Sequence, residues 1–448
     1  MVEPTIVPRA EHSFSRRDVD PDALKVLYRL HEHNFVAYLV GGSVRDLLLK
    51  RRPKDFDIGT SAHPHQIKKL FRNCWIIGRR FRLAHVKFGT KTIEVATFRR
   101  QVEASESTPE VEAATVGPED IIAPGGHALA EPHGGGRGRR RADEHLIQRD
   151  NSYGTPEEDA FRRDFTVNAL FYDIGTFALI DYVGGLRDLD ARLIRCIGDP
   201  DVRFLEDPVR MLRAVVLAAR LQFTIDEPVL DAISTHAHEI ARSAPARLIE
   251  EFYKILRSGH AEDAFRQLRA TGLLREMAAE MTSGSVEPLW RSIAAIDRYR
   301  AKFEGAPESL TNTILAGTLL APLGLIGGRR FSADALERRV ELGMLPISRR
   351  DVERLQQILA IQPRLLDLQA SQRSQRGLLH RAVLDEALTW IEIHGERPEV
   401  VAYWRELQAE AAANPQHQPV LETAADAGAP PPVRRRRRRR RPRRTPHV

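Results

Sequence analysis

The segment 39–60, LVGGSVRDLLLKRRPKDFDIGT, brings together the residue types that phosphate and metal chemistry require. Gly41 and Gly42 end a β-prone run, where glycine lets the backbone approach a ligand and the amides that open the next helix suit phosphate. Asp55 and Asp57 lie two residues apart on an expected strand, so their carboxylates point to the same side. Because adjacent carboxylates repel each other, we expect them to bind Mg²⁺, which prefers a few carboxylates together with substrate phosphates.

The order of these features is more specific than the Asp-x-Asp pair itself. Two further pairs of this kind occur at 18–20 and 188–190, and we regard them as incidental. The alternative interpretation is an ordinary turn with two solvent-facing carboxylates, which the sequence of Gly-Gly, charged helix and Asp-x-Asp strand disfavours. Two Mg²⁺ ions at such a site can activate an attacking 3′-hydroxyl and stabilise a leaving pyrophosphate.

On these residues the chain resembles the class II polymerase-β-like nucleotidyltransferases, the family of bacterial poly(A) polymerases and tRNA CCA-adding enzymes. Residues 162–172, RRDFTVNALFY, look like the family's ribose- and triphosphate-contacting motif. Residues 205–213, LEDPVRMLR, look like its base-reading motif. The resemblance is strong over 22–260, weaker over 260–413 and only compositional beyond.

The resemblance implies a role for each matching residue. Asp55 and Asp57 are the expected ligands of two Mg²⁺ ions. Asp164 is favoured as the third catalytic carboxylate and Glu94 as a supporting carboxylate, and the two roles are not exclusive. The residues expected to contact the phosphates and ribose of the substrate ATP are Gly41, Gly42, Ser43, Arg45, Arg162, Arg163 and Asn168.

The base-reading motif supplies an acid and an arginine. Asp207 and Arg210 are three residues apart, which places them on one face of an expected helix. The resemblance implies that they complement a donor and acceptor pair on the incoming base, and a helix-surface ion pair is the alternative. Just beyond them the family commonly reads RAVRFAA, whereas this chain has Val216 and Leu217 in place of the arginine and the aromatic residue.

The stretch 78–86, GRRFRLAHV, resembles the signature that separates bacterial poly(A) polymerases from CCA-adding enzymes. Arg79, Arg80 and Arg82 are therefore expected to bind RNA near the active face. A hairpin edge protected by charge is the alternative interpretation.

The charge of the chain is concentrated at its C-terminus. The net charge is +7, but residues 434–444 contain ten arginines, and without them 58 basic residues face 61 acidic ones, a net charge of −3. A block of like charge is typical of a solvated segment that meets a polyanion, and no apolar face favours a membrane. The tail residues expected to bind RNA are Arg434, Arg435, Arg436, Arg437, Arg438, Arg439, Arg440, Arg441, Arg443 and Arg444.

The elements that must position these residues change in character near residue 200. We predict an α+β protein with a polymerase-β-like nucleotidyltransferase α/β head at 22–200, interrupted by a mobile insertion at 101–149. A helical neck at 201–260 and a helical body at 261–413 follow, and residues 1–21 and 414–448 are expected to be disordered. The expected strands are 36–40, 56–59, 84–89, 92–98, 165–172, 178–183 and 194–197. The longest expected helices are 205–222, 227–241, 245–258, 287–303, 350–361 and 376–413.

Composition excludes several other classes. No run of about 18 apolar residues is present, so we expect no membrane span. The N-terminus lacks the apolar region of a signal peptide. Cys74 and Cys196 are the only cysteines, which excludes a disulfide framework or a Cys-rich zinc site and favours a reducing, cytoplasmic location.

We therefore predict a template-independent enzyme that adds AMP from ATP to RNA 3′ ends and so marks RNAs for decay. It is expected to act as a monomer, with RNA, ATP and RNA decay factors as partners. A tRNA CCA-adding enzyme with the same head is the nearest alternative. A non-catalytic RNA-binding protein is the alternative from another class, which the intact motifs disfavour.

Overall fold

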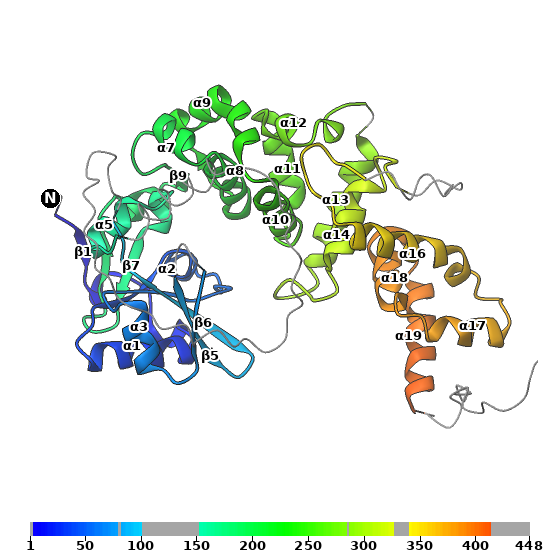
Figure 1. Ribbon diagram of the computed structural model, residues 1–448, viewed down its shortest axis with the longest axis horizontal. Helices are drawn as coiled ribbons and strands as arrows, with labels where there is room; N and C mark the ends of the chain where they lie inside the picture. The colour runs from blue at the N-terminus through cyan, green and yellow to red at the C-terminus, as the bar shows by residue number, and fades with distance from the viewer. Residues whose placement is uncertain (1–2, 79–81, 101–151, 285, 327–339, 414–448) are drawn as a thin grey trace, which may run out of the picture. The chain divides into compact units, whose positions relative to one another are not determined.

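The computed structural model describes residues 3–78, 82–100, 152–284, 286–326 and 340–413 (Figure 1). The described chain up to Arg397 belongs to one unit, and helix α19 (Pro398–Ala413) belongs to a second. The expected insertion at 101–149 and the tail at 414–448 lie outside the described residues. Among the described helices, none is both long enough and apolar enough to cross a bilayer.

An eight-stranded mixed sheet organises the N-terminal part, in the order β1-β8-β7-β2-β3-β6-β5-β4. Only β3 and β6 pair in parallel among these strands. The strands are β1 (Thr5–Val7), β2 (Ala37–Val40), β3 (Asp57–Thr60), β4 (Cys74–Ile77), β5 (Leu83–Phe88), β6 (Lys91–Thr97), β7 (Leu170–Asp173) and β8 (Leu179–Asp181). The expected α/β head is therefore confirmed.

One face of the sheet packs against two helices, α1 (Pro21–Glu32) and α3 (Pro64–Leu70) (Figure 1). Helix α1 begins at Pro21 because the Asp20 carboxylate accepts hydrogen bonds from the first free amides, a standard helix N-cap. Its residues Val26, Leu27 and Leu30 recur at helical spacing and are fully buried.

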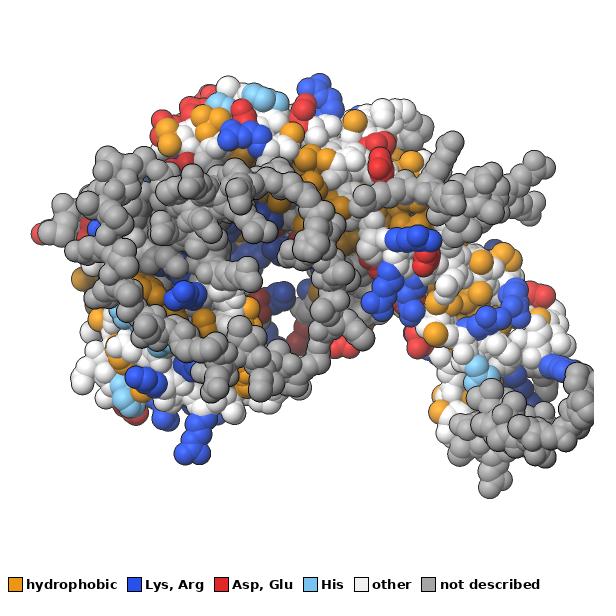
Figure 2. Space-filling view, in the orientation of Figure 1, with side chains coloured by type: hydrophobic (Ala, Val, Ile, Leu, Met, Phe, Trp, Pro, Cys, Tyr) orange, Lys and Arg blue, Asp and Glu red, His pale blue; other side chains and the backbone are white. Residues whose placement is uncertain are grey.

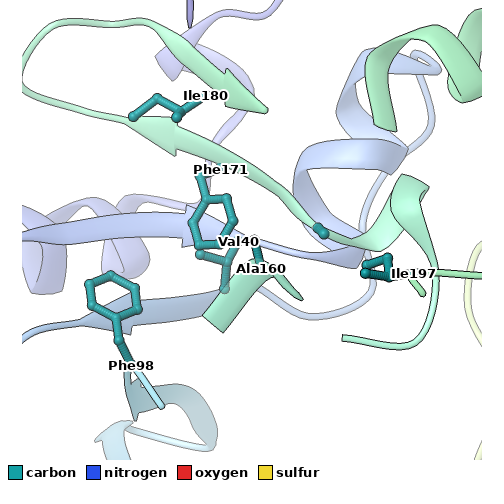
Figure 3. Close-up of a cluster of buried hydrophobic side chains, with 7 residues drawn as sticks. Val40, Phe98, Ala160, Phe171, Ile180 and Ile197 are labelled. Carbon is teal, nitrogen blue, oxygen red and sulfur yellow. The ribbon is translucent and has the colours of Figure 1, made fainter. Parts of the chain in front are cut away.

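The other face is closed over only part of its width. There a cluster of side chains from β2, β7, β8 and α5 (Pro156–Phe161) fills the core (Figure 3). Gly59 in the middle of β3 makes room for it, since a Cβ atom there would lie 2.6 Å from Cε1 of Phe98. The members of the cluster are Val40, Phe98, Ala160, Ala169, Phe171, Ile180 and Ile197.

Helices dominate after residue 200, as predicted. They are α7 (Pro200–Glu206), α8 (Val209–Leu221), α9 (Glu227–His236), α10 (Pro245–Leu256), α11 (Ala261–Ala270), α12 (Leu273–Met277), α13 (Glu287–Arg300), α14 (Asn312–Leu320), α16 (Arg349–Leu366), α17 (Gln372–Leu379) and α18 (Leu384–Trp390). On the face drawn in Figure 2, Lys and Arg side chains are mixed with Asp and Glu side chains over this helical part. That pattern agrees with the small net charge of the chain without its tail.

Several expected elements differ from the structure. The expectation that residues 1–21 are disordered is wrong for 3–21, because β1 pairs with β8 and Phe14 is 2% exposed. The expected strand 165–172 begins only at Leu170, since Thr166–Asn168 form a 3-10 turn whose Thr166 hydroxyl donates to Asp188.

Two short strands were also missed by the sequence prediction. Strand β4 forms the edge of the main sheet beyond β5. Strand β10 (Thr224–Ile225) pairs in parallel with β9 (Leu193–Ile194) and lies within the region predicted to be entirely helical.

Candidate active site

A glycine turn joins the end of β2 to α2 (Gly42–Leu48). Gly41 has a φ of +73°, which other residues rarely adopt, and its amide donates to the carbonyl oxygen of Leu170 at 3.1 Å. A Cβ atom at Gly41 would lie 3.1 Å from Nη1 of Arg163. Glycine at this position therefore leaves room for a guanidinium group beside the turn.

Strand pairing decides what lies next to Asp57, the first residue of β3. Antiparallel pairing with β2 sets Asp57 opposite Val40, the last residue before the glycine turn. Parallel pairing with β6 sets Asp57 opposite Glu94. Because paired residues of adjacent strands point to the same face, two carboxylates and the glycine turn meet at one end of β3.

The electrostatic environment of Asp57 is unfavourable for a lone carboxylate. Burial, together with the negative charges of Glu94 and Asp55, raises the pKa of Asp57 to about 6, while Arg163 opposes the shift. Asp55 lies before β3 begins, and 70% of its side chain is exposed. The predicted placement of both aspartates on one strand is therefore wrong, although the charge of Asp55 still acts on Asp57.

These three acidic groups fit a hard divalent cation better than a transition metal. Their oxygen donors suit Mg²⁺, which binds through one or two carboxylates and keeps its remaining positions for water and substrate phosphates. Within the described residues, no group of three or more His, Cys, Asp or Glu side chains is placed to hold a metal ion, so these three carboxylates are not a complete ligand set by themselves.

The structure places Glu94, and not Asp164, beside Asp57. Glu94 leaves 48% of its side chain exposed, and Nε2 of His85 on β5 lies 3.6 Å from its Oε1. Asp164 instead accepts a hydrogen bond from Nε of Arg210 at 2.9 Å and pairs with Nη1 of Arg213 at 2.5 Å. The prediction that favoured Asp164 as the third catalytic carboxylate is not supported by this placement.

A buried aspartate fixes the two arginines of the RRD motif. Asp159 on α5 is 3% exposed and accepts hydrogen bonds from Nε of Arg162 at 2.9 Å and from Nη2 of Arg163 at 2.8 Å. Burial alone would raise the pKa of Asp159, but the two guanidinium groups outweigh it and hold the pKa below its usual value. Arg163 is thus anchored with its charge acting on Asp57.

Ser43 and Arg45 lie beneath the glycine turn, and each is 2% exposed. The Ser43 hydroxyl donates to the carbonyl oxygen of Val40 at 3.0 Å, and Arg45 donates to Oδ1 of Asn168. Burial lowers the pKa of Arg45 to about 10 despite the neighbouring carboxylate of Asp46. In this structure Ser43 and Arg45 support the turn from within, so the expected direct contact with phosphate is not open to them.

The base-reading residues lie at a junction between two helices. Pro208 disfavours helical backbone at the preceding residue, and Asp207 accordingly has φ −144° and ψ 95°. The expected continuous helix 205–222 is therefore split into α7 and α8. Asp207 is the C-cap of the first helix and Arg210 lies in the first turn of the second, so the prediction that they share one helix face is wrong.

Each of these two residues has its own partner. Asp207 accepts from Nη1 and Nη2 of Arg247 on α10 at 3.2 and 2.9 Å. Burial would raise the pKa of Asp207, but Arg247 outweighs it and lowers the pKa. Arg210 donates to Asp164 of the head and, through Nη1, to Glu206 at 2.9 Å.

Helix α8 is attached to the head at both ends. At its start, Arg210 and Arg213 share the Asp164 carboxylate. At its end, Arg51 from the loop before β3 donates to the carbonyl oxygen of Arg220 at 3.1 Å. Through these contacts the base-reading junction and the carboxylates of β3 are held in one framework.

Some residues of this framework were missed from sequence, although weak signals were present. Asp159 lies three and four residues before Arg162 and Arg163, which is the spacing of ion pairs on a helix. For Arg247 the helical spacing predicts a pair with Glu251, four residues on, but in the structure its partner is Asp207, 40 residues away, and Glu251 pairs with Lys254.

The expected RNA-binding arginines fall mostly outside the described residues. These are Arg79, Arg80 and the ten arginines of the tail, which stay predictions. Arg82 is described and exposed, with a φ of +41°, at the start of the segment that leads into β5.

The fold and the site together define a nucleotidyltransferase. Family models match three parts of the chain: "Poly A polymerase head domain" at 37–195, "Probable RNA and SrmB- binding site of polymerase A" at 222–283, and "Polymerase A arginine-rich C-terminus" at 333–445. The chain is 38% identical to Poly(A) polymerase I of Salmonella typhi, over 98% of this chain and 93% of that protein. The chain belongs to the bacterial poly(A) polymerase family.

Other relatives cover less of the chain. Poly(A) polymerase I of Escherichia coli O157:H7 is 44% identical over 59% of this chain and 51% of its own length. A CCA-adding enzyme of Lactobacillus helveticus is 34% identical over 58% of this chain and 56% of its own. The solved CCA-adding enzyme of Bacillus stearothermophilus in complex with CTP has the same fold, with a TM-score of 0.58 at 24% identity over 89% of this chain and 84% of that one.

We predict that Asp57→Asn stabilises the metal-free protein. Above pH 6 the ionised Asp57 costs the folded state about 1–3 kcal/mol, because each unit by which its pKa exceeds the unfolded value corresponds to about 1.4 kcal/mol. Below the unfolded value of 3.8 the carboxyl group is protonated in both states, so the gain should fade as the pH decreases from 6 towards 4. Urea unfolding of wild type and variant at pH 7.5 and pH 5 measures this difference.

Asp190→Asn is the matched control, because Asp190 is an exposed carboxylate of an incidental Asp-x-Asp pair. Millimolar Mg²⁺ should stabilise wild type and the control but not Asp57→Asn. Equal stabilisation of all three by Mg²⁺ would show that Asp57 is not a metal ligand.

Proposed function

We propose that this chain transfers AMP from ATP to RNA 3′ ends without a template and releases pyrophosphate, as a polynucleotide adenylyltransferase. The observation that carries the proposal is the pairing of Asp57 with Glu94 beside the glycine turn. The similarity to Poly(A) polymerase I over nearly the whole chain supports the choice of nucleotide and acceptor.

The reaction is a direct in-line displacement, so no protein nucleophile is needed. The RNA 3′-oxygen forms a bond to the α-phosphorus of ATP, and the bond from that phosphorus to the bridging oxygen breaks. Pyrophosphate leaves with those electrons, and the hydroxyl proton passes to solvent. The protein must therefore align the RNA 3′-oxygen, the α-phosphorus and the leaving pyrophosphate, and it must stabilise the negative charge on the two oxygens.

Asp55 and Asp57 are the residues that would hold Mg²⁺, with Glu94 beside them. When bound, two Mg²⁺ ions supply the positive charge that favours the 3′-oxyanion and the leaving pyrophosphate. Asp57 must be ionised for this role, and its pKa is raised first by burial and then by the charges of Glu94 and Asp55, which a bound cation would oppose.

The chain's other residues orient the nucleotide. Arg163, fixed by Asp159, lies beside Gly41 of the glycine turn and suits a phosphate oxygen. Asp207 and Arg210 offer an acceptor and donors for the edge of adenine. Because Arg247 and Asp164 hold them in place, their geometry is set before the nucleotide binds.

A tRNA CCA-adding reaction is the second candidate, since relatives of that name match more than half of the chain. One assay separates the candidates: purified protein with labelled ATP or CTP and two primers, oligo(A) and a tRNA that lacks its CCA end. Long adenylate tails on oligo(A) support the proposal, and addition that stops after the CCA end is complete supports the alternative. No incorporation on either primer would leave only an RNA-binding role.

We predict that Arg210→Ala weakens the preference for ATP over the other three nucleotides, because it removes donors at the base-reading junction. The measurement is kcat/KM for each nucleotide on oligo(A). We expect the ratio of ATP to CTP to fall roughly tenfold or more, the effect of losing about one good hydrogen-bond pair. Arg266→Ala is the control, because this arginine contacts Glu262 on its own helix α11 and the ring of Trp290 on α13, and neither residue belongs to the base-reading junction. Equal slowing for all four nucleotides would contradict a base-reading role.

We also predict that deleting residues 433–448 flattens the salt dependence of RNA affinity. Single-stranded RNA binding loses about 0.7 logarithmic units per neutralised phosphate for each tenfold rise in salt, so the loss of several arginines removes several units of slope. RNA affinity is measured at four salt concentrations for both proteins. The first adenylate addition at saturating RNA should be unchanged, and identical slopes would exclude the tail from RNA binding.

A further inference from the structure

The face of the sheet that carries Asp57 continues past the candidate active site. In β5 and β6 every second residue is buried, and these residues face α1 and α3, where Lys25 lies over the ring of Phe88. The residues between them point to the opposite face. The buried set is Ala84, Val86, Ile93 and Val95.

The strand register places the side chains that point away from α1 and α3 in a row. Asp57 on β3 is opposite Glu94 on β6, Glu94 is opposite His85 on β5, and His85 is opposite Trp75 on β4. Opposite residues share a face of the sheet, so a straight line of side chains runs from the candidate catalytic carboxylate to the edge strand. The row crosses three strand spacings of about 4.8 Å, so Trp75 lies about 14 Å from Asp57.

The outer end of this row is exposed and chemically distinctive. Trp75 is 51% exposed and Ile77, two residues along the same strand, is 50% exposed. Nζ of Lys87 lies 5.3 Å from the centre of the Trp75 ring. Exposed aromatic rings beside cations are the groups on which proteins bind single-stranded nucleic acid, through base stacking and phosphate contacts.

We propose that Trp75, Ile77 and Lys87, here called the edge platform, bind the single-stranded RNA that leads to the reacting 3′ end. This inference rests on the proposed function, because it requires an RNA end at Asp57. The position of the platform supports this inference, because an RNA strand that reaches the carboxylates along this row of side chains must pass the platform. At a rise of about 3.4 Å per stacked nucleotide, 14 Å corresponds to about four nucleotides.

Charge supports the same occupant. The row is acidic at Asp57 and Glu94, where metal ions are expected, and Lys87 beside its outer end supplies the cation that a phosphate backbone would need. If the platform instead bound a protein partner that pairs with the edge strand β4, its substitution would not make RNA affinity depend on primer length. The dependence on RNA length therefore distinguishes the two occupants.

The test compares Trp75→Ala, Trp75→Phe and wild type on oligo(A) primers of two, four, six and twelve nucleotides. For the longer primers we expect Trp75→Ala to raise the KM for RNA about tenfold, while kcat and the KM for ATP change less than about twofold; tenfold corresponds to about 1.4 kcal/mol, within the range for stacking one base. Trp75→Phe should restore most of the affinity. For the dinucleotide, which does not reach the platform, the variants should match wild type.

Tyr28→Ala is the matched control, because Tyr28 is a 39% exposed aromatic residue on α1, which covers the opposite face. Lys87→Ala should reduce the salt slope of RNA binding by about 0.7. A KM for long primers that Trp75→Ala leaves unchanged, or a loss confined to kcat, would overturn the proposal.

Binding of labelled oligo(A) is measured separately by fluorescence anisotropy, without ATP. If wild type adds no nucleotide but Trp75→Ala still weakens binding of the twelve-nucleotide RNA, the proposed function fails and the platform stands. If wild type adds adenylate and the variant binds RNA normally, the platform fails and the proposed function stands.

Discussion

The parallel pairing of β3 with β6 is the constraint on which the rest of the candidate site depends. It sets Asp57 and Glu94 side by side at the border of the core, where burial and the negative charge of Glu94 disfavour the ionised form of Asp57. Such a pair needs a nearby positive charge to offset its unfavourable electrostatic energy. In this chain the buried Asp159 holds Arg163 in position to supply that charge. One guanidinium group is not enough to return the pKa of Asp57 to its usual value. The remaining deficit of positive charge is what a divalent cation and its nucleotide can fill.

The second constraint is the position of the base relative to those carboxylates. Two helices meet at Asp207 and Pro208, and a junction of this kind would be a flexible point if nothing fixed it. Arg247 on α10 holds Asp207 in place, and Asp164 of the head holds Arg210 in place. Asp164 therefore links the RRD motif to the neck, and its effect on catalysis would act through Arg210 as a positioning residue. Asp164 lies among arginines and away from the other carboxylates because it joins the head to the neck.

Much of this architecture could be predicted from the sequence because its signals are local. Alternation in 92–98 and the glycine turn at 41–42 are short-range patterns, and the structure has a strand and a turn there. The rest depends on contacts that spacing does not encode. The split of 205–222 follows from one proline, and the choice of Glu94 over Asp164 follows from a strand register between segments 37 residues apart. Strand β1 was missed because a three-residue segment is stabilised only by its neighbour β8.

The arginines of the head and neck bear on how a chain with so many acidic residues binds RNA. Arg45, Arg163, Arg210 and Arg247 each pair with a carboxylate of the chain itself. Such pairs fix geometry, but they leave little net positive charge for a long polyanion. Affinity for RNA must then come from groups outside this internal network. The two groups proposed above fit this need: the exposed ring and lysine at the sheet edge, where stacking would tolerate any base, and the basic tail, whose positive charge would attract RNA at any position along the strand. Neither selects a sequence, which is the property that template-independent addition to many different RNA ends requires.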